Sequence, residues 1–164
     1  MARAYVGIGS NIEPEQNIRS AVRALRTRYA ALAISPVYQS PADGFAGDDF
    51  FNLVIGFDTA EPAHTIAAVL AEIEQRQGRV RYGNGMHSRT LDLDLLLYGN
   101  AIVREPGLTL PRPDIIRFAF VLKPLADLAP QLRHPEFGLS LQELWRDFAG
   151  KRGALTPVSL EPPL

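Results

Sequence analysis

The sequence lacks several features that would point to particular classes of protein. It has no cysteine, which excludes a disulfide framework and thiolate chemistry. Its formal net charge is only −1, so no overall field draws it to nucleic acid or to a membrane surface. No apolar run reaches the ~18 residues of a membrane helix, and no charged-then-apolar leader begins the sequence. We therefore expect a cytoplasmic protein with no nucleic-acid or membrane partner.

A Gly-rich Walker loop with Lys and Ser/Thr is also absent, so any nucleotide is not held in the P-loop manner. Lysine itself is scarce. Lys123 and Lys151 are the only lysines among 17 basic residues, and the others are arginines. An arginine presents a planar fork that suits carboxylates and phosphates.

The remaining composition is that of a globular protein, with 46% apolar and 21% charged residues. A length of 164 residues suits one domain, and no repeat or linker divides it. We expect a single domain over residues 1–164. Three prolines after Lys151 predict a loosely ordered tail from about residue 151.

Strand-like and helix-like patterns alternate along the chain, which predicts an α+β fold with a ferredoxin-like sheet and helices packed on both of its faces. The expected strands are 4–8, 34–38 with a bend at Pro36, 50–57 and 91–98, with a hairpin partner at 101–103; the expected helices begin at Pro14, Pro62 and Asp114, the last with an interruption at Pro124, and a final helix spans about 140–148.

The segment 91–97 alternates leucines with Asp92 and Asp94, which is the period of a β-strand. Residues two apart share a face, so the two Cβ atoms should lie about 6.5–7 Å apart. Like charges at that distance repel by roughly 2–3 kcal/mol at an effective dielectric near 20. Carboxylates without neighbouring Cys or His suit Mg²⁺. The alternative is the solvated face of an edge strand, whereas the apolar run 95–97 favours a central, buried strand.

Arginines precede this strand: Arg79, Arg81 and Arg89 lie within about a dozen residues of it. Phosphoryl-transfer enzymes position a polyphosphate and neutralise its charge with metal ions and arginines, and this segment supplies both. The alternative for Arg79 and Arg81 is a pair of surface salt bridges with Glu72 or Glu74.

A second cluster follows the loop 40–49. Phe45, Phe50 and Phe51 stand near Asn52, whose side-chain amide can both donate and accept hydrogen bonds. The combination fits a flat heterocycle stacked on Phe and bound by an amide. The alternative, which spacing alone favours, is a set of core phenylalanines with a satisfied Asn.

Two motifs resemble those of the 6-hydroxymethyl-7,8-dihydropterin pyrophosphokinase family. Gly-Ser-Asn at 9–11 is similar to its N-terminal signature. Gly-Arg-Val-Arg at 78–81, followed by a loop and Arg-Thr-Leu-Asp-Leu-Asp-Leu at 89–95, is similar to its central signature. The second motif is highly specific, and the resemblance runs from about residue 4 to 135.

The resemblance implies transfer of the β,γ-diphosphate of ATP to the hydroxymethyl group of a dihydropterin in folate biosynthesis, leaving AMP. It implies that Asp92 and Asp94 are catalytic and hold two Mg²⁺ ions, and that Arg79 and Arg89 are catalytic in a flexible loop. The implied pterin-binding residues are Ser40, Pro41, Asp43, Phe50, Asn52 and Phe120, and the implied nucleotide-binding residues are Glu74, Arg81, Leu95, Thr109 and Arg112.

The chain departs from the family pattern where phosphate contacts are expected. Each lost charge-assisted contact would weaken nucleotide binding by about 1.5–3 kcal/mol. Arg112, Arg117 and His87 are candidates to replace these contacts, and the retained aspartates argue for an active enzyme. The departures are Met86-His87-Ser88 before Arg89 in place of an aromatic-Gly-Pro run, Pro111-Arg112-Pro113 where the middle residue is commonly His, and Gly107 and Phe118 where Arg is common.

Two other functions stay open at this point. One is a non-catalytic module that binds a pterin or a nucleotide. The other is an Mg²⁺-dependent enzyme that acts on a different pterin or alcohol. The resemblance implies small-molecule substrates as partners and a monomer as the usual state, with a dimer as the alternative.

Overall fold

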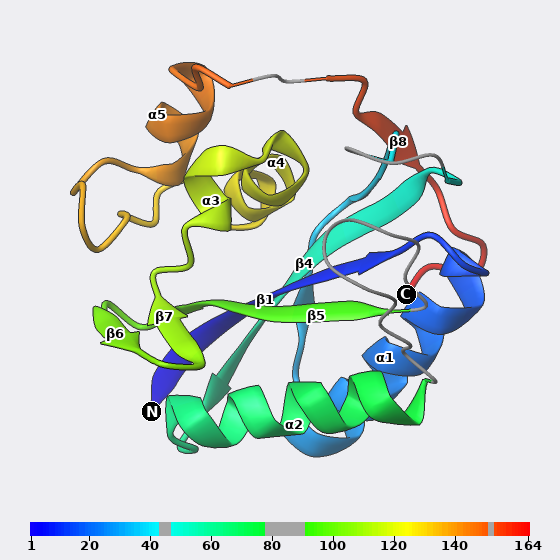
Figure 1. The fold of residues 1–164 in the computed structure, drawn as a ribbon, viewed down its shortest axis with the longest axis horizontal. Coiled ribbons are helices and arrows are strands. Elements are labelled where there is room, and N and C mark those ends of the chain that lie inside the picture. The colour runs from blue at the N-terminus through cyan, green and yellow to red at the C-terminus, as the bar shows by residue number, and fades with distance from the viewer. Residues whose placement is uncertain (43–46, 78–90, 151–152) are drawn as a thin grey trace.

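The computed structural model describes residues 1–42, 47–77, 91–150 and 153–164 (Figure 1). Its centre is a six-stranded antiparallel sheet in the order β5-β1-β4-β3-β8, with β2 paired to β4. The bend expected at Pro36 separates β2 from β3. The strands are β1 (Ala2–Ser10), β2 (Ala33–Ile34), β3 (Val37–Ser40), β4 (Phe50–Thr59), β5 (Asp92–Tyr98) and β8 (Thr156–Val158).

Helices cover both faces of this sheet (Figure 1). One face packs against α1 (Pro14–Tyr29) and α2 (Ala63–Arg76), whose apolar residues at three- and four-residue spacing form the larger core cluster. The other face is covered by α3 (Asp114–Arg117) and α4 (Ala119–Leu128), and α5 (Leu141–Arg146) packs on α4. These layers confirm the α+β class. Among the described helices, none combines the length and apolar character needed to cross a membrane.

The aspartate strand, β5, lies at the edge of the described sheet, so the central position predicted from residues 95–97 is wrong. Those leucines are nevertheless buried. Leu95 packs in the core cluster with residues of α2, and Leu96 and Leu97 pack in the cluster with residues of α3 and α4. A separate two-stranded sheet, β6 (Val103–Glu105) with β7 (Leu108–Leu110), contacts β5 through β7. The hairpin expected at 101–103 therefore forms between β6 and β7 and does not pair back onto β5.

The interruption expected at Pro124 occurs six residues earlier. Phe118 has an extended backbone (φ −123°, ψ 123°) and separates α3 from α4. Pro124 lies inside α4 and is buried. Its burial offsets the cost of the backbone hydrogen bond that is lost because proline has no N–H.

One segment of the C-terminal tail forms a strand, although the prolines after Lys151 predicted a loosely ordered tail. Thr156–Val158 forms β8, antiparallel to β3, with Val37 opposite Val158. This pairing gives main-chain partners to the outer edge of β3, which would otherwise be an open edge.

Candidate active site

Asp92 and Asp94 share one face of β5, as their spacing predicts. Leu93 and Leu95 between and after them point into the core against α1 and α2, so the carboxylates face the side of the sheet that α3 and α4 cover. On β1, the residues opposite Asp92 and Asp94 are Gly9 and Gly7. Glycines at these two positions put no side chain beside the carboxylates.

Gly9 also lies between the aspartate strand and the next strand, β4. It pairs with Asp92 on one side and with Asn52 on the other. Asn52 is therefore on the same face as Asp92, two strand spacings or about 9–10 Å away. A Cβ atom on residue 9 would lie 3.1 Å from Oδ1 of Asn52, so the glycine permits the close approach of this amide.

The amide of Asn52 is held by a second residue of the predicted pterin set. Its Nδ2 donates a hydrogen bond of 2.9 Å to Oγ of Ser40, and both side chains are buried. Ser40 pairs across the strands with Phe50, which is half-buried. The structure therefore brings Ser40, Phe50 and Asn52 together at one end of β3 and β4.

The structure describes two of the other predicted pterin-binding residues, Phe120 and Pro41. Phe120 lies in the first turn of α4, and its ring stacks on that of Phe118 with the centroids 5.0 Å apart. Pro41 is exposed just after β3. Asp43 lies outside the described residues.

Arg112 is the described basic residue nearest to the aspartate pair. Its backbone N–H donates to the carbonyl oxygen of Leu96 (3.0 Å), which fixes the segment beside β5. Its Nη2 lies 3.4 Å from Oδ1 of Asp94, and its Nε lies 3.4 Å from Oδ2 of Asp114. No sequence pattern indicated Asp114 as a member of this cluster.

Burial and the charge of Asp92 raise the pKa of Asp94 to about 7, although the guanidinium of Arg112 acts in the opposite direction. Asp94 is thus a carboxyl group in a poorly solvated place with a surplus of negative charge. A divalent cation would relieve that repulsion.

Glu74 has a clear structural contact at the same strand. Its Oε2 accepts a hydrogen bond of 2.7 Å from the backbone N–H of Leu93, and its side chain is buried. It therefore satisfies a donor on the edge of β5 that none of the described strands covers. Its negative charge also contributes to raising the pKa of Asp94, after burial and the charge of Asp92.

Leu95 and Thr109 are two further predicted nucleotide-binding residues that the structure describes. The side chain of Leu95 is buried in the core on the opposite face of β5. Thr109 is exposed on β7, opposite Arg104 in the two-stranded sheet. The remaining predicted residues, Arg79, Arg81 and Arg89, lie outside the described residues, as do Met86 and His87.

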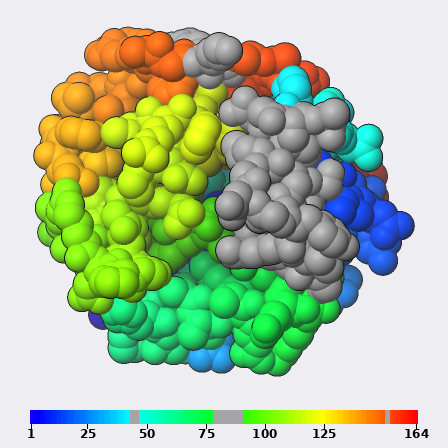
Figure 2. All heavy atoms as spheres, viewed as in Figure 1, coloured from blue at the N-terminus to red at the C-terminus, as the bar shows by residue number. Residues whose placement is uncertain are grey.

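The described residues fit Mg²⁺ better than a cation that needs a complete protein cage. Among them, no three His, Cys, Asp or Glu side chains form a group able to hold a metal ion. Two carboxylates can hold Mg²⁺ when substrate phosphates and water complete its octahedron. The surface of the molecule is hollowed between the α3–α4 segment and α2 (Figure 2).

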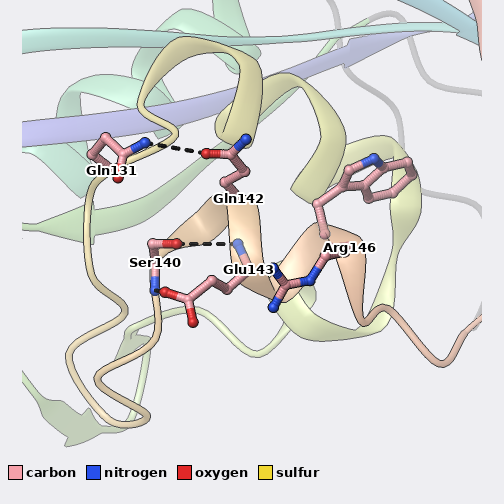
Figure 3. A pocket seen from close by; sticks show the side chains of 6 residues that line it. Gln131, Ser140, Gln142, Glu143 and Arg146 are labelled. Atoms are coloured by element: carbon pink, nitrogen blue, oxygen red, sulfur yellow. Dashed lines mark hydrogen bonds between the residues drawn. The ribbon is translucent and has the colours of Figure 1, made fainter.

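A separate pocket lies around α5 and includes none of the predicted site residues (Figure 3). Its walls carry a hydrogen bond from Gln131 to Gln142 (3.1 Å) and the capping box between Ser140 and Glu143. The polar side chains that line this pocket are therefore accounted for by the N-terminal cap of α5, which is a short helix.

A family model and the sequences of known relatives both point to the same family of proteins. Residues 5–130 match the model of the family described as 7,8-dihydro-6-hydroxymethylpterin-pyrophosphokinase (HPPK). A 2-amino-4-hydroxy-6-hydroxymethyldihydropteridine pyrophosphokinase of Pseudomonas aeruginosa is 42% identical over 149 residues, which cover 87% of this chain and 89% of the relative. The protein of the same name from Haemophilus influenzae is 34% identical over 153 residues, with coverage of 91% and 94%.

Solved structures agree on the fold. A Plasmodium falciparum HPPK-DHPS triple mutant crystallised with pteroate matches 90% of this chain with a TM-score of 0.72. This chain spans 43% of that longer chain, and at 11% identity the likeness concerns the fold alone. From the family model and the two bacterial relatives, the chain belongs to the 7,8-dihydro-6-hydroxymethylpterin-pyrophosphokinase family.

Proposed function

We propose that this protein transfers the diphosphate of ATP to the hydroxymethyl group of 6-hydroxymethyl-7,8-dihydropterin, a step of folate biosynthesis, and releases AMP. Its family and its relatives over most of the chain support this reaction. The observation that carries it is the row Asn52–Gly9–Asp92 across three adjacent strands. This row sets an amide suited to a heterocycle beside a carboxylate suited to a metal–phosphate complex.

In this proposal Asp92 and Asp94 hold two Mg²⁺ ions. When bound, Mg²⁺ neutralises charge on the triphosphate and on the attacking oxygen. The protein contributes two carboxylates fixed on a strand, with Arg112 beside Asp94 as a permanent cation. Because the Arg112 guanidinium has several donors, it can contact Asp94 or Asp114 and a phosphate oxygen at the same time.

The phosphates are further bound in this proposal by Arg79 and Arg89, which act in catalysis, and by Arg81. Positively charged side chains around the transferred group stabilise the charge that it develops. Glu74, Leu95 and Thr109 belong to the nucleotide half of the proposed site; for Leu95 the contact would come from its backbone, because its side chain lies in the core.

The pterin half uses the orientation of the Asn52 amide. Its Nδ2 donates to Ser40, and its Oδ1 lies over Gly9, toward the aspartate strand. Oδ1 is therefore placed to accept a hydrogen bond from a ring N–H of the pterin. Phe50 and Phe120 supply the stacking faces, and the segment from Ser40 through Pro41 to Asp43 borders the ring.

We also infer a ferredoxin-like arrangement, which the strand order β5-β1-β4-β3 and the positions of α1 and α2 after β1 and β4 support. We propose that the protein is a cytoplasmic monomer and that its partners are small molecules only.

Product analysis tests the reaction. ATP, Mg²⁺ and 6-hydroxymethyl-7,8-dihydropterin should give AMP, and the analogue with a methyl group in place of the hydroxymethyl group should give none. Formation of ADP would contradict diphosphate transfer. Binding of the pterin without AMP release would favour a non-catalytic module, and AMP release only with another alcohol would favour an altered substrate.

A further inference from the structure

A buried tyrosine joins the pterin half of the proposed site to the helix above it. Tyr38 is the direct cross-strand partner of Asn52, so its side chain leaves the same face of the sheet. The Tyr38 hydroxyl donates a hydrogen bond to Oδ2 of Asp127 on α4. Burial and the neighbouring carboxylate raise the pKa of Tyr38 to about 12, so the hydroxyl keeps its proton at neutral pH.

Asp127 is itself held by a second partner. Its Oδ1 accepts a hydrogen bond of 2.8 Å from Nζ of Lys123, one helical turn earlier. The same Nζ lies 5.5 Å from the centroid of the Trp145 ring on α5. Tyr38, Asp127 and Lys123, which we call the Tyr38 clasp, thus connect β3, α4 and α5.

The clasp and the proposed stacking residue share one face of α4. Phe120, Lys123 and Asp127 are spaced three and four residues apart, which puts them in a row along the helix. The hydrogen bond at the Asp127 end of this row joins α4 to β3, the strand that pairs with Asn52. Together with the apolar contacts of α4, it bears on the spacing between the helix that carries Phe120 and the strand that carries Asn52.

An apolar pair would pack the same two elements without the desolvation that a buried hydroxyl and a half-buried carboxylate require. Polar contacts in such a place define one arrangement of the layers more sharply than apolar packing does. This is the property that a slot for a flat ring needs, because a displacement of a fraction of an ångström removes stacking contact.

We propose that Asp127 is a positioning residue for the pterin half-site, acting through Tyr38 to set the gap between α4 and the strands that carry Asn52. The inference rests on the proposed function, because it concerns the pterin. The inference goes beyond the proposed function because Asp127 and Tyr38 would support the pterin site without touching the substrate.

The test is a double-mutant cycle on the protein of residues 1–164. Tyr38→Phe and Asp127→Ala should each weaken binding of 6-hydroxymethylpterin about fivefold or more, as expected for one lost hydrogen bond. The double variant should bind 6-hydroxymethylpterin no more weakly than the weaker of the two single variants, since each substitution removes the same hydrogen bond. The dissociation constant of a non-hydrolysable ATP analogue should stay within about twofold of the wild-type value, since the clasp lies on the pterin side.

A matched control separates positioning from a general loss of stability. Ser140→Ala removes the hydrogen bond that caps α5 in the same helical layer, and should lower the melting temperature without changing pterin affinity. Trp145 is the only tryptophan, so its fluorescence reports the clasp directly and should shift in Asp127→Ala.

The outcomes are distinguishable. If the wild-type protein binds the pterin and both clasp variants bind it equally well, the positioning role is wrong. Effects of Tyr38→Phe and Asp127→Ala that add up would also overturn it, because they would not arise from one shared bond. A wild-type protein that binds no pterin contradicts the proposed function itself.

Discussion

Nη2 of Arg112 lies 3.4 Å from Oδ1 of Asp94, which makes an arginine the counter-ion of a carboxyl group whose pKa burial raises. The resemblance to the family places Arg112 where histidine is common. An arginine keeps its charge at every accessible pH, whereas a histidine changes its charge near neutrality. This chain therefore has a permanent cation beside the carboxylate that we assign to the metal.

The Arg112→Gln variant should separate metal binding from nucleotide binding. In the substrate-free protein at pH 8, loss of the guanidinium should strengthen Mn²⁺ binding about threefold to tenfold, because Asp94 loses a competing cation. ATP should bind about tenfold more weakly, since a charge-assisted phosphate contact is lost. Electron paramagnetic resonance measures the first effect and calorimetry the second.

Arg23→Gln is the matched control, because Arg23 is exposed on α1, which covers the face of the sheet opposite the carboxylates. It should change neither constant by more than about twofold. Weaker Mn²⁺ binding by Arg112→Gln would show that the guanidinium supports the metal and does not compete with it.

The raised pKa of Asp94 predicts a dependence of stability on pH in the metal-free protein. The folded state keeps this proton up to a pH of about 7, whereas the carboxyl of an unfolded chain loses it near 3.8. The folded state binds more protons between these values, so ionisation of Asp94 lowers the free energy of unfolding as the pH rises toward 7. Asp94→Asn should therefore be more stable than the wild type at pH 8 in EDTA, by about 1–3 kcal/mol.

Urea unfolding at several pH values checks this expectation. The advantage of Asp94→Asn should shrink as the pH is lowered toward 4. Asp58→Asn, at an exposed aspartate paired with Arg3, should show no such gain at pH 8. An Asp94→Asn variant that is less stable than the wild type at pH 8 would contradict the environment described for this carboxyl.

Gly9→Ala tests the row across the three strands. The new Cβ atom would lie 3.1 Å from Oδ1 of Asn52, so the amide must shift by a few tenths of an ångström. We expect pterin affinity to fall about threefold to tenfold through loss of hydrogen-bond geometry, with a small change in stability.

Gly7→Ala supplies the comparison on the same strand and face. Its Cβ atom would make an ordinary contact of 3.4 Å with the side chain of Leu96. Pterin affinity, measured by fluorescence titration, should be near that of the wild type. Equal losses in the two variants would mean that β1 tolerates no side chain here, and would remove the argument for Asn52.

Gly107 shows a physical reason for one departure from the family pattern. It lies in the turn between β6 and β7 with φ +83°, a conformation that L side chains rarely adopt. Gly107→Arg should lower the free energy of unfolding by about 1 kcal/mol, and Gly107→Ala by the same amount, because the cost is in the backbone. If an arginine here contacts the nucleotide, Gly107→Arg should bind ATP more tightly than Gly107→Ala does. Unchanged unfolding midpoints in both variants would show that the turn holds no such strain.

The parts of the fold that depend on local pattern follow from the sequence. The shared face of Asp92 and Asp94, the apolar stripes of α1 and α2, and the bend at Pro36 are all set by residues close together in the chain. The position of β5 does not follow, because its buried leucines pack against α2 on one face and against α3 and α4 on the other, and β1 is its only partner among the described strands.

The site depends more on contacts between distant segments. Asn52 meets Asp92 across Gly9 only through the register of two strand pairs. The Tyr38–Asp127 hydrogen bond joins residues 89 positions apart. No periodicity encodes such pairs. The residues after the loop 40–49 indicated Asn52 as a candidate, with a core role as the alternative, whereas Arg112 came only from the resemblance to a family.

Phosphorus NMR of the complete reaction, on the wild-type protein and on Asp92→Asn and Asp94→Asn, is the most direct test of the central claim. With ATP, Mg²⁺ and 6-hydroxymethyl-7,8-dihydropterin, the wild type should give AMP and the pterin diphosphate in equal amounts. Each substitution should slow their formation by about a hundredfold or more, because it removes a ligand of the metal that stabilises the transferred charge. AMP formation at the wild-type rate by both variants, or ADP as the product, would contradict the account.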